Sequence, residues 1–165
     1  QAIAEGLLQQ GIELVILGSG EAQYENFFNE LCARNPGRVG VYIGFNAKLA
    51  QQIYAGADIF LMPSRSEPCG LAQMVSCRYG TIPVIRETGG LKDSIRDSGD
   101  GYGNGFTFAN YNAHELYEAC WRAKEGYWQK DGWPVLVKRA MECDFSWSNS
   151  AKSYEGLYNE VVNLW

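Results

Sequence analysis

Short apolar runs alternate with amphipathic segments along almost the whole chain, and this alternation constrains the fold more than any other feature. The first run, residues 13–17, is rich in leucine and β-branched residues and stops at a glycine-containing turn. Continuous apolar runs of this length are typical of strands buried on both faces of a parallel sheet. The next segment, 22–34, carries Phe27, Phe28 and Leu31 at helical spacing. Repeated strand–helix units imply right-handed crossovers and an α/β fold with a doubly wound parallel sheet.

The same alternation continues to the end of the chain. Besides these elements, the pattern predicts strands at 39–43, 58–62, 82–85 and 105–108, and helices at 1–10, 47–55, 71–79, 91–95, 112–125, 133–141 and 147–162. In a doubly wound sheet, ligands bind in the crevice beyond the carboxyl ends of the strands. The segments predicted at that edge are 18–20, 44–45, 63–71 and 86–91.

Composition narrows the class of protein. A length of 165 residues suits one domain, and a net charge of −5 without any lysine or arginine run argues against nucleic acid or an anionic membrane as partner. The five cysteines are irregularly spaced, with neither a CxxC pair nor a signal peptide, which favours a reduced, cytoplasmic compartment. Because His114 is the only histidine and no cysteines cluster, no metal site is expected.

The most informative stretch is 57–71, Ala-Asp-Ile-Phe-Leu-Met-Pro-Ser-Arg-Ser-Glu-Pro-Cys-Gly-Leu. A strand delivers a loop in which prolines stiffen the backbone on either side of Glu67, and Gly70 lets the backbone approach a ligand closely. The first amides of the following helix, near Leu71 and Ala72, are unpaired donors at the positive end of a helix dipole, which suits a diphosphate. A carboxylate that caps the helix is an equally good interpretation of Glu67.

Two other edge segments carry weaker signals. A plain strand-to-helix turn is favoured over a ligand site at Gly18-Ser-Gly20, because a short Gly-x-Gly is common. The Gly89-Gly90 pair, with Arg86 and Thr88 as side-chain donors, is interpreted equally well as a second nest of amides or as a tight turn. At Cys69, a small buried side chain is favoured over a nucleophile, since no histidine lies nearby in sequence to activate the thiol.

Four segments together resemble one enzyme family. Pro63-Ser-Arg-Ser-Glu-Pro-Cys-Gly-Leu71, Arg78-Tyr-Gly-Thr-Ile-Pro-Val84 and Thr88-Gly-Gly-Leu-Lys-Asp93 closely resemble linked segments of bacterial glycogen synthases and plant starch synthases. Asp144-Phe-Ser-Trp147, followed by Ala151-Lys-Ser-Tyr154, resembles their C-terminal helix region. The similarity covers nearly the whole chain in the same order.

The resemblance implies a specific fold and activity. Enzymes of this family have two Rossmann-like lobes and transfer glucose from ADP-glucose to the non-reducing 4-hydroxyl of an α-1,4-glucan, with retention of configuration and no metal or other cofactor. Residues 1–165 resemble the C-terminal, nucleotide-sugar-binding lobe without its first strand. The acceptor glucan would be bound mainly by the absent N-terminal lobe, toward which a helix at 147–165 is expected to pack.

The start of the chain fits that expectation. Gln1 opens directly into a helical pattern without a methionine or a cap, which is expected of a piece of a larger protein. The family's N-terminal lobe and the phosphate-binding cations of the first strand are not in this sequence. Weak donor binding and negligible transfer are therefore expected of these 165 residues alone.

The resemblance also assigns roles to residues. Glu67 corresponds to the catalytic carboxylate, which positions the donor sugar and stabilises charge at the reacting centre. Phe45 is the aromatic expected to stack on adenine. The other residues expected to bind the donor nucleotide-sugar, several of them through backbone amides, are Gly18, Gly20, Gly44, Cys69, Gly70, Leu71, Ala72, Thr88 and Gly89.

Three positions depart from the family pattern. Val75 stands where many related transferases carry a second glutamate, as is common in the glycogen synthase branch, and Ser66 replaces a common aromatic residue. Ala72 replaces a polar residue, so only its backbone amide remains as a phosphate contact. Two alternatives stay open: a UDP-sugar-dependent retaining transferase of the same architecture, and a nucleotide- or glucan-binding module without catalysis.

Overall fold

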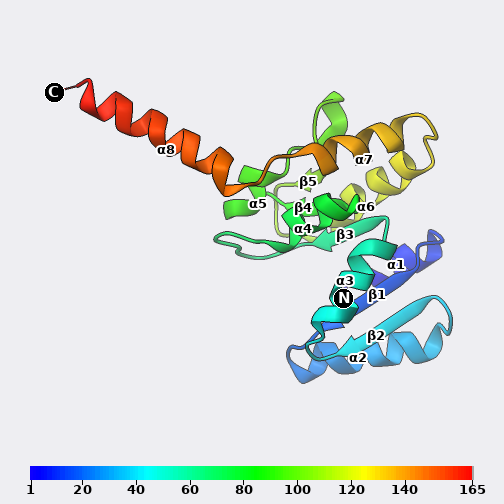
Figure 1. The fold of residues 1–165 in the computed structure, drawn as a ribbon. Helices are drawn as coiled ribbons and strands as arrows, with labels where there is room; N and C mark the ends of the chain where they lie inside the picture. Colours follow the sequence, from blue (N-terminus) through cyan, green and yellow to red (C-terminus); the bar gives the residue numbers. More distant parts are fainter. Residues whose placement is uncertain (165) are drawn as a thin grey trace.

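The structure, a computed structural model, describes residues 1–164 as an α/β chain (Figure 1). The C-terminal helix expected at 147–165 spans Trp147–Val162, and Trp165 lies outside the described residues. In chain order the elements are α1 (Ala4–Gln9), β1 (Leu14–Gly18), α2 (Ala22–Arg34), β2 (Val39–Ile43), α3 (Ala47–Gly56), β3 (Ile59–Met62), α4 (Ala72–Tyr79), β4 (Ile82–Arg86), α5 (Gly89–Ser94), a 3₁₀ turn (Ser98–Asp100), β5 (Phe106–Phe108), α6 (Ala113–Tyr127), α7 (Gly132–Glu142) and α8 (Trp147–Val162).

All strand pairs are parallel, as predicted, but the described strands form two sheets rather than one continuous sheet. One sheet pairs β1 with β2, and the other has the order β3-β4-β5. Strands β1 and β3 lie at the facing edges of the two sheets (Figure 1). This arrangement fits the doubly wound strand order 3-2-1-4-5-6 without its strand 1, which would pair with both edges.

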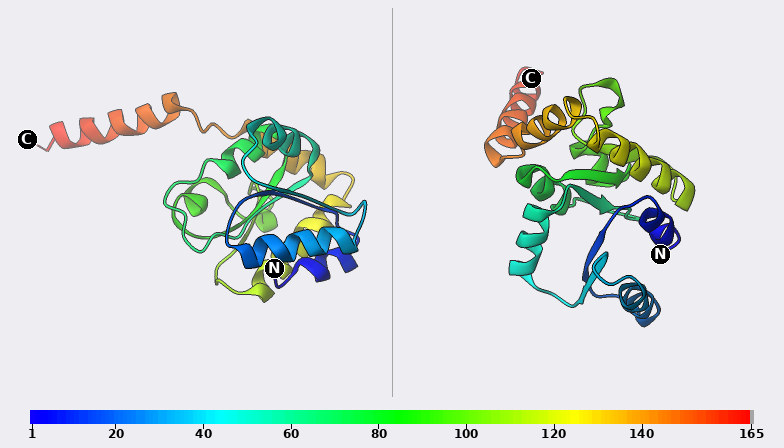
Figure 2. Two further views of the ribbon diagram at one scale, coloured as in Figure 1. Left: turned by 90° about the horizontal axis from the view of Figure 1, so that it is seen from below. Right: turned by 90° about the vertical axis from the view of Figure 1, so that its right-hand side faces the viewer.

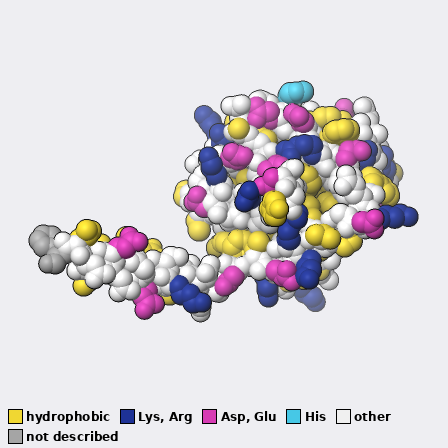
Figure 3. Space-filling view, turned by 90° about the horizontal axis from the view of Figure 1, so that it is seen from above, with side chains coloured by type: hydrophobic (Ala, Val, Ile, Leu, Met, Phe, Trp, Pro, Cys, Tyr) yellow, Lys and Arg dark blue, Asp and Glu magenta, His cyan; other side chains and the backbone are white. Residues whose placement is uncertain are grey.

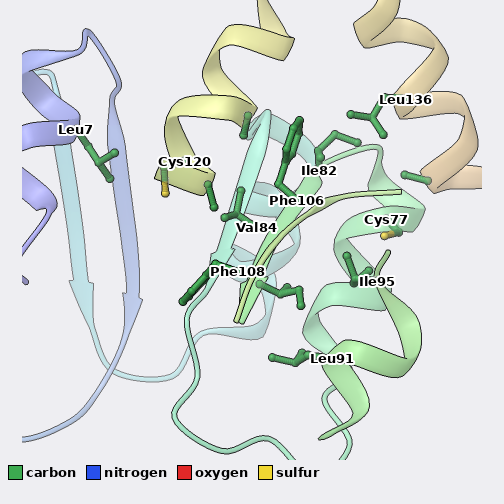
Figure 4. Close-up of a cluster of buried hydrophobic side chains, with 14 residues drawn as sticks. Leu7, Cys77, Ile82, Val84, Leu91, Ile95, Phe106, Phe108, Cys120 and Leu136 are labelled. Atoms are coloured by element: carbon green, nitrogen blue, oxygen red, sulfur yellow. The ribbon is translucent and has the colours of Figure 1, made fainter. Parts of the chain in front are cut away.

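The main core lies around β4, the central strand of the three-stranded sheet (Figure 4). Ile82, Val84 and Ile85 are fully buried. Because successive residues of a strand point to opposite faces, burial of consecutive residues requires cover on both faces of the sheet. Helices α4, α5, α6 and α7 all contact β4 and supply that cover.

The two-stranded sheet is covered less completely. Helix α2 packs on β2 and buries Leu31 against Val39 and α1. Val15 in β1 remains 61% exposed, and α3 buries none of its residues. In the side view of Figure 2 this sheet and α2 form a layer apart from the β4-centred core.

Helix α8 projects from the rest of the molecule (Figures 1 and 3). It begins at an N-cap, where the Ser146 hydroxyl accepts a hydrogen bond from the Asn149 amide. None of its residues is buried, and its exposed apolar and aromatic side chains include Trp147, Tyr154, Leu157, Tyr158, Val161 and Val162. Across residues 1–164, no helix combines the length and apolar character needed to cross a bilayer.

Candidate functional site

The carboxyl ends of the strands lie at one edge of the molecule. Figure 4 shows the strands of the two sheets running in the same direction. At this edge the Gly44 amide donates a hydrogen bond to the Gly18 carbonyl at 2.8 Å, so the ends of β1 and β2 are in direct contact. The loop 63–71 follows β3, and the start of α5 follows β4. Every segment predicted at the binding edge is therefore placed there.

Glu67 lies half-buried in the loop between β3 and α4. The capping interpretation is wrong, because the N-cap of α4 is Leu71 and no side chain caps this helix. Within residues 1–164 the Glu67 carboxylate has no hydrogen-bond or ion-pair partner. The carboxylate is thus available to a ligand.

Gly70 has to be glycine for two reasons. Its φ of +72° lies in the left-handed region that residues with a β-carbon rarely adopt. A β-carbon at this position would also lie 2.7 Å from Oε1 of Gln73 and 3.1 Å from Cγ of Glu67. The tight turn at Gly70 directs the chain from the Glu67 loop into α4.

The start of α4 supplies unpaired donors. The amides of Cys69, Gly70, Leu71 and Ala72 donate to no acceptor within residues 1–164. The predicted helix began at Leu71, whereas α4 begins at Ala72 with Leu71 as N-cap, which leaves the Leu71 amide outside the helix. Free amides at the positive end of a helix dipole favour an anion such as a phosphate.

The Gly89-Gly90 pair packs on the Glu67 loop, and of its two amides only that of Gly89 has no acceptor within residues 1–164. The Gly90 amide donates to the carbonyls of Glu67 and Pro68, at 3.2 and 3.3 Å. β-Carbons on Gly89 and Gly90 would overlap the carbonyl oxygens of Glu67 and Cys69 respectively, which explains why two glycines are needed.

Of the two side-chain donors expected at this edge, Arg86 is engaged within the chain, whereas the Thr88 hydroxyl has no hydrogen-bond partner within residues 1–164. The Thr88 amide donates to the Arg86 carbonyl at 2.9 Å. The Arg86 guanidinium donates to the Arg65 carbonyl at 2.8 Å and lies over the Tyr111 ring. Arg86 therefore braces the loop that carries Glu67.

The residues expected near adenine lie on the two-stranded sheet. Gly18 and Gly44 are joined by their backbone hydrogen bond, and Gly44 has a φ of +138°. The Phe45 ring that follows is 92% exposed and free to stack on a planar ligand. The Gly20 amide donates to the Glu25 carboxylate at 2.8 Å, so it is occupied by α2.

The cysteines differ in exposure. Cys69 is exposed, so its interpretation as a small buried side chain is wrong, because the loop turns its thiol outward before Gly70. Burial raises the pKa of the Cys77 and Cys120 thiols to about 12, which keeps both protonated and unreactive. Within residues 1–164, no three His, Cys, Asp or Glu side chains gather as metal ligands would.

Sequence reasoning missed Gln73 and Ser94. Gln73 is fully buried in the first turn of α4, and its side chain contacts the Gly70 carbonyl and the Ser94 hydroxyl of α5. A glutamine three residues after Gly70, in the first turn of a predicted helix, was the available signal, but its burial depends on where α5 packs, which periodicity does not give.

Two shallow surface hollows lie away from Glu67. Both are lined by the segment from Lys92 to Arg96 on the flank of α5, one together with α7 and the other together with Glu87 and Thr107. Neither hollow includes the start of α4.

Comparison with known proteins places this edge in context. The family model described as glycosyl transferases group 1 matches residues 1–127. The chain is 49% identical to a glycogen synthase of Bacillus anthracis and to one of Geobacillus thermodenitrificans, in each case over 94% of this chain and 33% of the relative. The chain therefore spans about a third of the length of the curated relatives it matches.

Solved structures agree with this result. The catalytic domain of starch synthase IV from Arabidopsis thaliana, bound to ADP and acarbose, matches with a TM-score of 0.85 and 35% identity, over 98% of this chain and 35% of that one. Anabaena HepE in complex with UDP-glucose matches with a TM-score of 0.68 at 20% identity, over 86% of this chain and 39% of that one, which shows a shared fold alone. The chain thus belongs to the group 1 glycosyl transferases.

Proposed function

We propose that this chain is the donor-binding part of a glycogen or starch synthase that transfers glucose from ADP-glucose to an α-1,4-glucan with retention. The observation that carries the proposal is the group of four unpaired amides at the start of α4 beside the free carboxylate of Glu67. Glycogen synthases with 49% identity and a starch synthase structure bound to ADP support it. The proposed enzyme uses no metal and no other cofactor. We also propose that it acts in the cytoplasm.

The geometry suits the charges that develop during glycosyl transfer. When the bond between the anomeric carbon and the diphosphate breaks, negative charge grows on the phosphate and positive charge grows on the sugar. Amides at Leu71 and Ala72 would stabilise the phosphate, and the Glu67 carboxylate would stabilise the sugar. Because the amides are fixed by the backbone, they need little reorganisation at the moment of reaction.

Adenine is proposed to stack on Phe45 at the end of β2. The Phe45 ring is exposed, and the space beside Gly18 is open. A 92% exposed ring can stack on uracil as well as on adenine, so UDP-glucose remains the alternative donor. The ADP-bound starch synthase IV structure favours adenine.

We propose that a further lobe binds the acceptor glucan and packs against α8. The glucan would be bound mainly by a further lobe, against which the exposed apolar side chains of α8, such as Trp147 and Leu157, would pack. Packing of this kind would bury surface that a solitary helix leaves in water.

Calorimetric titration of the chain with ADP and with UDP tests the donor assignment. ADP is expected to bind more tightly than UDP, because the larger adenine ring stacks better on Phe45. Equal affinities for the two nucleotides would contradict the adenine assignment.

A second titration tests Glu67. The Glu67→Ala variant is expected to bind ADP within about twofold of the unsubstituted chain and to bind ADP-glucose several-fold more weakly, since the carboxylate serves the sugar. Glu118→Ala, an exposed change on α6, is the matched control and is expected to change neither affinity. A Glu67→Ala variant that loses ADP and ADP-glucose equally would remove Glu67 from its proposed role.

A further inference from the structure

We propose that Gln73 is a positioning residue that turns the Leu71 amide toward the distal phosphate of the donor. The inference rests on the proposed function, since it concerns how the same site holds a diphosphate. It assigns a role to a side chain that is fully buried and does not itself face the open edge.

The hydrogen bonds of Gln73 fix the orientation of its amide group. Nε2 of Gln73 donates to the Gly70 carbonyl at 2.8 Å and to the Ser94 hydroxyl at 3.0 Å. The Ser94 hydroxyl donates in turn to the Gly90 carbonyl at 2.7 Å, so it acts as acceptor toward Gln73. The NH₂ group therefore faces Gly70 and Ser94, and the two groups it contacts belong to different segments of the edge.

The hydrogen bond from Gln73 to the Gly70 carbonyl also determines the direction in which the Leu71 N–H points. The peptide between Gly70 and Leu71 is trans, and in a trans peptide the C=O and the N–H point in opposite directions. Gln73 holds the Gly70 carbonyl toward the interior. The Leu71 N–H therefore points away from the interior, in a residue that is 67% exposed.

Glutamine at this buried position makes two hydrogen bonds through Nε2 and also carries a cost. Oε1 of Gln73 is buried without a hydrogen-bond partner within the described residues. A buried acceptor without a partner costs about 1–3 kcal/mol. A methionine would fill a similar volume without that cost, but it could not donate to the Gly70 carbonyl.

The Glu67 loop is consequently held at both ends. At one end the Gly90 amide binds the Glu67 and Pro68 carbonyls, and at the other end Gln73 binds Gly70. Ser94 joins the two attachments, because it contacts both Gln73 and the Gly90 carbonyl. Preorganised donors of this kind bind an anion without first losing conformational freedom.

Comparison of ADP with AMP tests the proposal, because AMP lacks the distal phosphate. In calorimetric titrations of the chain, Gln73→Met is expected to weaken ADP binding about tenfold, as expected for loss of one hydrogen bond to a charged group, and to leave AMP binding unchanged. Ser94→Ala is expected to act in the same direction by about threefold, since it removes one of the two contacts that hold Gln73. Equal weakening of ADP and AMP, or no change in either, would overturn the proposal.

The matched control is Ser76→Ala, a change at an equally buried polar residue of α4 whose hydroxyl donates to the Gln73 carbonyl. It is expected to leave the ratio of ADP to AMP affinity unaltered. A changed ratio in this variant would show that any disturbance of α4 has the effect, which contradicts a specific role for the Gln73 side chain.

A second measurement separates this inference from the proposed function. If the unsubstituted chain binds no ADP, the donor assignment fails, and ¹⁵N relaxation of the nucleotide-free chain still decides whether Gln73 positions the loop. Order parameters at Gly70 and Leu71 are expected to fall in Gln73→Met and to stay unchanged in Ser76→Ala. Unaltered order parameters in Gln73→Met would overturn the positioning role.

Discussion

The two sheets of the molecule share one strand direction but differ in how completely they are packed. In the three-stranded sheet, β4 has a strand on each side and helices on both faces, and Val84 is fully buried. In the two-stranded sheet, β1 has one neighbouring strand, and Val15 is 61% exposed. The same residue type is therefore core in one region and surface in the other, so strand pairing decides burial as much as hydrophobicity does.

This difference divides the proposed site. The residues proposed to hold the sugar and the phosphate belong to the well-packed region, and they are Glu67, Gly70 and Leu71. Their loop is held by Gly90 and Gln73. Phe45, proposed to stack on the base, belongs to the less packed region. The Glu67 loop, which would act on the reacting bond, is thus held more rigidly than Phe45.

The largest expected effect is a difference in stability loss between the two sheets when a valine in each is replaced by alanine. Val84→Ala is expected to lower the free energy of unfolding by about 2.5 kcal/mol, because it removes buried methyl groups and leaves a cavity. Val15→Ala is expected to change it by less than about 0.5 kcal/mol, as exposed sites do. Urea denaturation of both variants measures the difference, and equal losses would contradict the contrast between the two sheets.

Glycines provide the second comparison. Gly90→Ala is expected to destabilise the chain by about 2 kcal/mol, since the new β-carbon would overlap the Cys69 carbonyl. Gly56→Ala at the end of α3 meets nothing within 4 Å and is expected to be neutral or slightly stabilising. Thermal melting monitored by circular dichroism distinguishes the two, and a neutral Gly90→Ala would show that the loop does not pack tightly on α5.

Removing ion pairs is expected to lower stability least, and the loss at Asp97 is expected to depend on pH. Burial acts to raise the pKa of Asp97, but hydrogen bonds from the Thr107 amide, the Arg122 guanidinium and the Gly99 amide outweigh it and hold the pKa below its usual range. The resulting stability is present above the unfolded-state pKa of about 3.9 and is lost as pH falls through the lower folded-state pKa.

Asp97→Asn is therefore expected to cost about 1 kcal/mol at pH 7 and progressively less below about pH 4. Glu5→Gln, which breaks the exposed pair between α1 and Arg34 of α2, is expected to cost less than about 0.5 kcal/mol. Denaturant titrations at several pH values test this, and a cost for Asp97→Asn that does not shrink in acid would contradict the account.

Much of the fold could be predicted from the sequence because its apolar periodicity is strong. Helices α2 and α8 and strand β2 have the predicted bounds. The helix predicted at 1–10 begins only at Ala4, and the helix predicted at 91–95 begins at Gly89, because capping and tertiary contacts rather than periodicity set helix ends. The break between β1 and β3 leaves no signal in the apolar periodicity, since each strand carries the pattern of a central strand; only the resemblance to a lobe without its first strand predicts it.

The site was predictable in position but not in its internal contacts. The carboxyl ends of the strands follow from the βαβ alternation, which predicted that Phe45 follows β2 and Glu67 follows β3, as the structure shows. The engagement of the Gly90 amide by the Glu67 loop and the burial of Gln73 depend on long-range packing. Such packing leaves no local periodicity for a sequence pattern to show.

Amide mapping by two-dimensional ¹H–¹⁵N NMR during an ADP titration tests the central claim most directly. The account predicts that the amides of Leu71 and Ala72 in one region and of Gly44 and Phe45 in the other shift together and report one dissociation constant. Shifts confined to one region, or centred on the α5 flank from Lys92 to Arg96, would contradict a single donor nucleotide held across the ends of both sheets.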